Sequence, residues 1–303
     1  MPIKPHHRHQ RQNPVHCSDD LVRTTRQAVA NALAANFPCD PLFDPSLAKL
    51  LSTCGSIVKR HGGLIEAAIA EALVESGMEV WRNVRIPFMR SALTIVSSPD
   101  FALDRIQRIT FSQDDIGGYF DADIVAVDAR WACALQVRRG GGETGPVKRR
   151  RMEREIRAVD LSLISWLRQL GFDTVETGGA ALVDWLGLSG FSADITLHGE
   201  ALDVALGAPA TAKIEAMSAT LRQTLDGQIA TLLRPVVAAV DVDKNQHARR
   251  GRRTVLDTAG QPIVGPHLRQ EQTLDNPRQP ELDRATSFRF PRPERGDGAK
   301  RFH

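Results

Sequence analysis

The hydrophobic positions of this chain recur at helical spacing in five stretches. The clearest stripe lies in residues 64–76, where apolar side chains stand three or four positions apart and define one face of an amphipathic helix. Gly62 and Gly63 are expected to interrupt the chain before this helix, and Gly77 to end it. The other predicted helices cover residues 18–36, 46–60, 146–170 and 212–240, with Ser18 as the N-cap of the first.

Strand patterns occupy the regions between these helices. Residues 79–88 alternate in polarity, and one face of that strand collects Val80, Arg82, Val84 and Ile86. The segment SALTIVSS is expected to extend this strand or pair with it, and residues 99–120 to form mostly loop. Apolar runs at 124–127 and 131–137 predict two strands joined by a tight turn, and a last strand follows Gly178 and Gly179. The resulting order, helix–strand–strand–strand–helix–strand, predicts an α/β fold.

The two ends of the chain differ from its middle in composition. Residues 1–17 are rich in His, Arg, Gln and Pro, and residues 244–303 hold 13 Lys and Arg against 7 Asp and Glu. Such segments contain too little apolar surface to form a core, so both are expected to be disordered tails. The predicted organisation is therefore a tail at 1–17, a helical segment at 18–60, an α/β domain at 61–243 and a basic tail at 244–303.

Composition also argues against several classes of protein. The four cysteines form no C-x₂₋₄-C pair, which disfavours a zinc ribbon or finger. Aromatic residues make up 5% of the chain, which disfavours single-strand binding by base stacking. The N-terminus is polar and no uninterrupted apolar run is long enough to cross a bilayer, so a cytoplasmic protein without membrane contact is expected.

Polar residues with metal-binding chemistry gather in the predicted hairpin. Asp123 precedes one strand, and Gln136 and Arg138 stand two positions apart near the end of the next, on one face. Positions 123 and 136 are symmetric about the turn at 129–130, so Asp123 and Gln136 are predicted to be neighbours. With the Val137 carbonyl they supply oxygen ligands of the kind that Mg²⁺ prefers. Arg138 adds a positive charge suited to a phosphodiester transition state.

In this order of elements, these residues resemble the PD-(D/E)XK nuclease superfamily, especially its restriction-endonuclease-like and Holliday-junction-resolvase-like members. The resemblance covers residues 62–187 of 303. It implies an αβββαβ core with a mixed sheet and a Mg²⁺- or Mn²⁺-dependent DNA endonuclease. It also implies that Asp123, Gln136 and the Val137 carbonyl bind the metal, that Glu66 on the preceding helix joins them, and that residue 138 orients the attacking water.

Two positions depart from the pattern of that superfamily. The acidic residue of the third strand is Gln136, as in some of its branches, and the usual lysine is Arg138. A guanidinium stays charged and is bulkier than an ammonium, so it is poorly suited to help deprotonate a nucleophile. Lys148, at the start of the following helix, is the alternative amine. Glu71 competes with Glu66 for the helical position, but it is expected to face solvent.

A basic cluster follows the predicted hairpin. Positions 148–157 hold six basic residues against two acidic ones, and the predicted DNA contacts are Lys148, Arg149, Arg150, Arg151 and Arg154. A solvated helix face with pairs such as Glu153–Arg157 is the alternative interpretation. A second cluster, ARRGRRT at 248–254, is compatible with nucleic-acid contact or with a plain basic tail.

The same residues are compatible with three other interpretations. The fold can serve as a non-catalytic nucleic-acid-binding or assembly module. The hairpin can simply carry solvated polar side chains. The glycine runs at 140–142 and 178–179 can serve small-molecule phosphates, although neither has the spacing of a P-loop. The near-heptad stripe of helix 212–240 suggests a homodimer interface, although packing on its own core is the more usual outcome.

Overall fold

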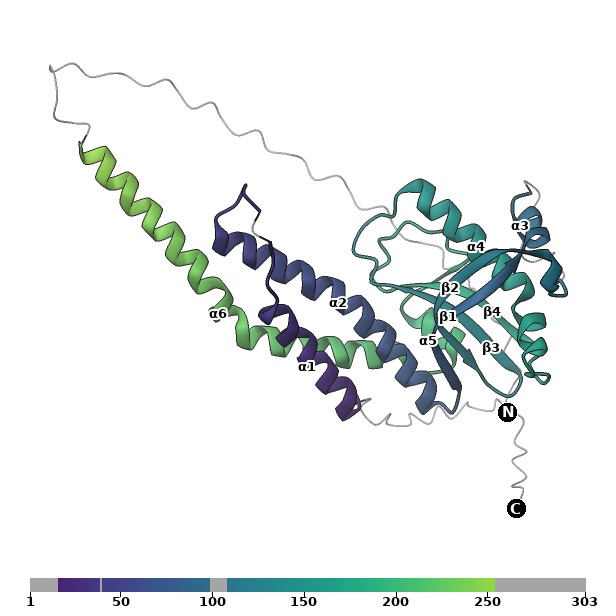
Figure 1. Cartoon of the computed structure of the whole chain (residues 1–303). Helices are drawn as coiled ribbons and strands as arrows, with labels where there is room; N and C mark the ends of the chain where they lie inside the picture. Colours follow the sequence, from purple (N-terminus) through teal and green to yellow (C-terminus); the bar gives the residue numbers. More distant parts are fainter. Residues whose placement is uncertain (1–15, 39, 99–107, 254–303) are drawn as a thin grey trace, which may run out of the picture.

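A computed structural model describes residues 16–38, 40–98 and 108–253, with side chains through residue 241 (Figure 1). Most of the two predicted tails therefore lies outside the described residues. The core is a five-stranded mixed sheet in the order β1-β2-β3-β4-β5. Strands β1 to β3 are antiparallel neighbours, whereas β3 to β5 run parallel. The α/β class predicted from the sequence is confirmed.

The helices and strands follow one another in the order that the sequence predicted, and the structure contains a few further short elements. The strands are β1 (Glu79–Met89), β2 (Ile116–Val127), β3 (Trp131–Arg138), β4 (Thr177–Asp184) and β5 (Thr196–Leu197). The helices are α1 (Asp19–Ala34), α2 (Pro45–Glu75), α3 (Arg90–Val96), α4 (Pro146–Gln169), α5 (Glu200–Leu206) and α6 (Ala210–Arg253), with a 3₁₀ turn at Gln113–Asp115. The predicted order αβββαβ is present from α2 to β4, with α3 inserted after β1.

Two hydrophobic cores lie on opposite faces of the sheet. On one face, α2 packs against the sheet next to side chains such as Ile124, Trp131 and Leu135, and the same core continues into the bundle that α1, α5 and α6 form with α2. On the other face, α3 and α4 cover side chains such as Val125 and Leu182. Because β3 and β4 are covered on both sides, their sequences are almost continuously apolar, as expected for the interior of a three-layer fold. Within the described residues, no helix is both long and apolar enough to span a membrane.

The expected chain break at Gly62 and Gly63 is wrong. α2 runs without interruption from Pro45 to Glu75, so the boundary predicted between residues 60 and 61 falls inside a helix. Each glycine in a helix costs about 1 kcal/mol relative to alanine, and burial of Leu64, Ile65 and their neighbours on the sheet outweighs that cost. The end at Gly77 is as expected, since this glycine has φ +84° directly after the helix.

Three further expectations about the elements are corrected. SALTIVSS contributes the helix α3 instead of a strand, and the partner of β1 is β2, which already begins at Ile116. Asp123 therefore lies well inside β2 and does not open it. At the C-terminal end, α6 continues to Arg253, past the boundary predicted at residue 243, and the short β5 and α5 were not predicted.

The side chains of β1 and β2 change faces near the middle of both strands. On β1, Val80 packs on the α2 side, but Val84 and Ile86 pack on the α4 side, so the single face predicted for them is wrong. On β2, Ala122 faces α4 and Ile124 faces α2, although they are two positions apart. Asn83 and Asp123 lie at this point, between the paired positions Arg82–Ile124 and Val84–Ala122, and Asn83 has φ +55°. A local distortion of both strands therefore reverses the alternation at Asp123.

Glu71 belongs to a buried ionic cluster instead of facing solvent. Lys213 of α6 is 1% exposed, and its Nζ donates to Glu71 Oε1 at 3.0 Å and to Glu75 Oε1 at 2.8 Å. The other Glu71 oxygen accepts from the Ser18 hydroxyl at 2.6 Å, while Ser18 also caps α1. This cluster ties α1, α2 and α6 together and removes Glu71 from contention for the metal site.

Candidate metal centre and nucleic-acid interface

The centre of the predicted site is a fork between β2 and β3. The antiparallel ladder between these strands starts at Val127–Ala132 and ends at Ile124–Leu135. In the same register the next facing positions are 123 and 136, and there the Asp123 side chain enters the space between the strands. Its Oδ2 accepts from Gln136 Nε2 at 2.5 Å and from the Val137 amide at 2.6 Å. The contact predicted between Asp123 and Gln136 is therefore present.

The environment of Asp123 opposes its negative charge. Burial raises its pKa from 3.8 to about 6; the hydrogen bond from the Val137 amide lowers that pKa, and the nearby Glu66 carboxylate raises it again. The positive charges of Arg138 and Arg82 have smaller lowering effects on the same pKa. Two carboxylates thus act on one another in a partly desolvated place, an arrangement that a bound cation would relieve.

Glu66 reaches this region from α2 and is held by Arg82 of β1. Its Oε1 accepts from Arg82 Nε at 2.9 Å and from Arg82 Nη2 at 2.5 Å. The Glu66 side chain is 15% exposed, whereas that of Arg82 is 45% exposed. The guanidinium is therefore the part of this pair that can move into solvent and leave the carboxylate free to bind a cation.

The donor set fits a hard divalent cation. Asp123 offers Oδ1, because Oδ2 accepts both of its described hydrogen bonds, and Glu66 offers a second carboxylate. The amide of Gln136 turns its nitrogen toward Asp123, so it must rotate by half a turn to present its oxygen. Two carboxylates with amide, carbonyl and water oxygens suit Mg²⁺ or Mn²⁺. In the described part of the chain, no cluster of three or more His, Cys, Asp and Glu is placed to hold a metal, so any metal here depends on this mixed set.

The structure treats the two proposed substitutes for the lysine differently. Arg138 ends β3, donates to the Thr144 hydroxyl at 2.9 Å, and lies 5.6 Å from the centre of the Phe191 ring. Its positive charge lowers the pKa of Asp123. Lys148 is exposed in the first turn of α4, and none of the described hydrogen bonds or ion pairs joins it to Asp123, Gln136 or Glu66.

The basic cluster forms one side of a shallow hollow between α3 and α4. Its lining residues are Val96, Ser97, Val147, Arg150, Arg151, Glu153, Arg154 and Arg157. Arg150 and Arg154 are exposed, whereas Arg149 pairs with Glu143 at 3.2 Å and Arg151 with Glu155 at 3.4 Å. The Glu153–Arg157 pair of the alternative interpretation is absent from the described contacts, because Arg157 binds Asp194 and Glu153 accepts from Ser192.

This basic surface adjoins the strand that carries Asp123. Burial raises the pKa of Glu155, the charges of Arg151 and Arg154 lower it, and that of Asp121 raises it. Asp121 stands two positions before Asp123 on β2. The end of β2 that precedes Asp123 therefore acts electrostatically on the basic side of α4.

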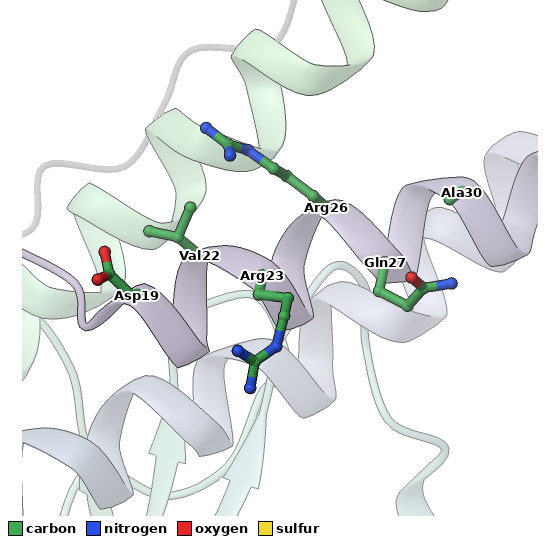
Figure 2. Close-up of a pocket in the computed structure, with 6 residues that line it drawn as sticks. All are labelled: Asp19, Val22, Arg23, Arg26, Gln27 and Ala30. Carbon is green, nitrogen blue, oxygen red and sulfur yellow. The ribbon is translucent and has the colours of Figure 1, made fainter.

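A second hollow lies on the helical bundle. Figure 2 shows that the described side chains around it, Asp19, Val22, Arg23, Arg26, Gln27 and Ala30, all come from α1. It mixes charges of both signs on a single helix, and it contains none of the residues predicted to be catalytic. We therefore assign it no part in the chemistry.

Three residues near the fork were not singled out from the sequence. Arg82 appeared only as a polar interruption of a strand, Asn83 carried no signal, and Asp184 lay inside an apolar run. Asp184 is 2% exposed beside Arg138 in the parallel pair of β3 and β4, and its Oδ2 accepts from the Ser189 amide at 2.9 Å. For Asp184 the available signal was a charged residue in an otherwise apolar strand; for Arg82 it was a charge on the alternating face of a strand that also carries Val80 and Val84.

Comparison with protein-family models gave no match. Comparisons with curated proteins and with solved structures gave no significant match either. A functional interpretation of this chain therefore rests on its own residues and their geometry.

Proposed function

We propose that this protein is a Mg²⁺- or Mn²⁺-dependent DNA endonuclease of the PD-(D/E)XK type. The observation that carries the proposal is the fork between β2 and β3. There Asp123, Gln136 and Val137 come into direct contact, and the charge of Glu66 acts on Asp123. The αβββαβ order of the surrounding elements supports it, as does the basic hollow over α4.

The chain's own residues would divide the work in the following way. Gln136 and the Val137 amide hold the Asp123 carboxylate in place, and Arg82 holds Glu66 on the α2 side. Arg138, steadied by Thr144, provides positive charge for a phosphate oxygen. A bound cation would activate water and neutralise the departing oxygen. Arg150 and Arg154 would contact the backbone without reading its sequence.

A non-catalytic nucleic-acid-binding module is the second candidate. The observation that favours it is the position of Arg138, which replaces the usual lysine and is already engaged by Thr144 and the Phe191 ring. Lys148 does not compensate in this structure, because it is exposed and has no described contact with the fork. Such a protein would keep the fold and bind DNA without cutting it.

A cleavage assay separates the two candidates. Supercoiled plasmid and a four-way DNA junction are incubated with the full chain and Mg²⁺ or Mn²⁺, alongside Asp123→Asn and Asp121→Asn. Asp121 is a matched control, because it lies on the same strand with its side chain 87% exposed. The nuclease proposal expects cleavage by the wild type and Asp121→Asn, and a loss of at least about 100-fold in Asp123→Asn. Metal-dependent binding without cleavage by the wild type would instead favour the second candidate.

A further inference from the structure

The far half of α6 exposes large apolar side chains to solvent. Near its start, Ile214, Met217 and Leu221 are buried in the bundle with α1 and α2. Further along, Ile229, Leu233, Val237 and Val240 are 45%, 42%, 57% and 49% exposed. We call these four residues the α6 strip. Contiguous exposed apolar surface of this kind marks an interaction site in a folded protein.

The α6 strip continues the buried seam of the same helix. Its members follow one another at intervals of four, four and three residues, so they share one side of the helix. The half-buried Leu225, Leu232 and Val236 lie next to them and connect the strip to Leu221. Between residues 227 and 240 only Arg234 is charged. A helix with so broad an apolar side belongs in the interior of a bundle.

A second apolar surface lies at the same end of the molecule. Leu42, Phe43, Leu51 and Val58, on the free half of α2 and the corner before it, are 84%, 43%, 48% and 46% exposed. In Figure 1 this half of α2 and the far half of α6 both extend away from the sheet. Together with the α6 strip, these side chains expose on the order of 800 Å², about the share that one partner buries in a standard stable interface.

We propose that the α6 strip is the interface between two copies of this chain. A two-fold arrangement presents the same surface from each copy, so the α6 strips and the α2 surfaces of two molecules can cover one another without a third component. The pairing extends the α1–α2–α6 bundle by helices of the same character, with apolar side chains at bundle spacing. It leaves the fork and the basic hollow over α4 on the sheet-bearing part of each copy.

Other occupants fit the strip less well. A helix that lies on a lipid surface carries a strongly charged polar side, but the side opposite the α6 strip holds the uncharged residues Thr231, Pro235 and Ala238. DNA would require more cations than the single Arg234. The chain's own segment 254–303 has 15 charged residues and six prolines among 50, so it offers little to an apolar strip.

The proposal is tested by the mass that the full chain has in solution. Light scattering after size-exclusion chromatography measures this mass at protein concentrations from about 1 to about 100 µM. The wild type is expected to have the mass of two chains. Leu233→Glu with Val237→Glu is expected to give one chain with unchanged circular dichroism, because both positions lie on solvent-exposed helix. Thr231→Glu with Ala238→Glu, on the opposite side of α6, is the matched control and is expected to keep two chains.

Three results would overturn the proposal. If the wild type stays monomeric throughout this concentration range, the α6 strip is not an interface between two copies of the chain. A dimer that survives Leu233→Glu with Val237→Glu has its interface elsewhere. A monomer that floats with anionic phosphatidylserine vesicles, and loses that property in the strip variant, assigns the surface to lipid.

Discussion

At the scale of single residues, the surroundings of Asp123 have opposing effects on the charge of its carboxyl group. Burial and the Glu66 carboxylate disfavour its charge, while the amide of Val137 and the cations Arg138 and Arg82 favour it. The net effect is a pKa of about 6 in place of 3.8. On the proposed function, the same property would make the residue a favourable ligand for a divalent cation, since the cation would offset its charge.

This balance predicts how stability depends on pH in the absence of metal. Between about pH 4 and pH 6 the folded chain keeps a proton on Asp123 that the unfolded chain releases, so the free energy of unfolding falls as pH rises through that window. Asp123→Asn has no carboxyl group to titrate, so its free energy of unfolding does not fall in this window for that reason. Its side-chain oxygen can still accept from the Val137 amide. The variant should be more stable than the wild type at pH 8, by roughly 1 kcal/mol once solvent screening is allowed for, and similar to it at pH 4.

Urea unfolding in the presence of a chelator measures the difference. Asp121→Asn is the control and should follow the wild type at both pH values, because its side chain is 87% exposed. If Asp123→Asn were less stable than the wild type at pH 8, the charge of Asp123 would be favourable in the fold, and this argument for cation binding at the fork would fail.

The Asp123–Gln136 contact was predictable because it is local. A tight turn fixes the register of a hairpin, so positions equidistant from the turn must face each other. The roles of Arg82 and Asn83 were not predictable in this way. Arg82 binds Glu66 across two elements, and the left-handed backbone at Asn83 reverses the faces of β1 and β2 in a sequence that still alternates regularly.

At the scale of elements, α2 shows how packing overrides local propensity. Gly62 and Gly63 lie in the middle of this 31-residue helix. A Cβ added to either glycine would have no neighbour within 4 Å, and neither residue has a positive φ. The sequence therefore indicated a break where tertiary contacts on both sides maintain a helix. The apolar strand β3 and the periodic helix α4 were predicted almost to the residue, since burial and propensity agree there.

Alanine at these two glycines tests the continuity of α2. Gly62→Ala and Gly63→Ala should each raise the free energy of unfolding by about 0.5–1 kcal/mol, because alanine loses less backbone entropy in a helix and meets no neighbour here. Thermal and urea unfolding would both report the gain. Gly178→Ala is the contrasting variant and should be destabilising, since its Cβ would lie 1.7 Å from the Ala132 carbonyl oxygen. Destabilisation by alanine at Gly62 or Gly63 would mean that the chain breaks there.

At the scale of the whole molecule, charge and apolar surface are separated. The basic hollow over α4 adjoins the sheet, whereas the α6 strip lies on the helices that extend away from it. Net charge gives no hint of this, because it is only +3 for 303 residues. The basic cluster was visible as a run in the sequence, but the hollow was not, because it also needs α3, which had been assigned as a strand.

The hollow predicts a salt-dependent affinity for duplex DNA. Arg150→Ala and Arg154→Ala should each weaken binding to all sequences alike and reduce the slope of log affinity against log salt by about 1. Fluorescence anisotropy across a salt series would measure both effects. Arg23→Ala on α1 is the control, since its side chain is 76% exposed and far from α4 in the chain. An unchanged slope in the α4 variants would place DNA elsewhere.

The most direct test of the account is a calorimetric titration of the metal-free chain with Mn²⁺ at neutral pH, comparing the wild type with Asp123→Asn and Asp121→Asn. We predict saturable binding by the wild type and by Asp121→Asn, and an affinity lower by at least about tenfold in Asp123→Asn. Absence of saturable binding by the wild type, or equal binding by Asp123→Asn, would contradict a metal centre at the fork between β2 and β3.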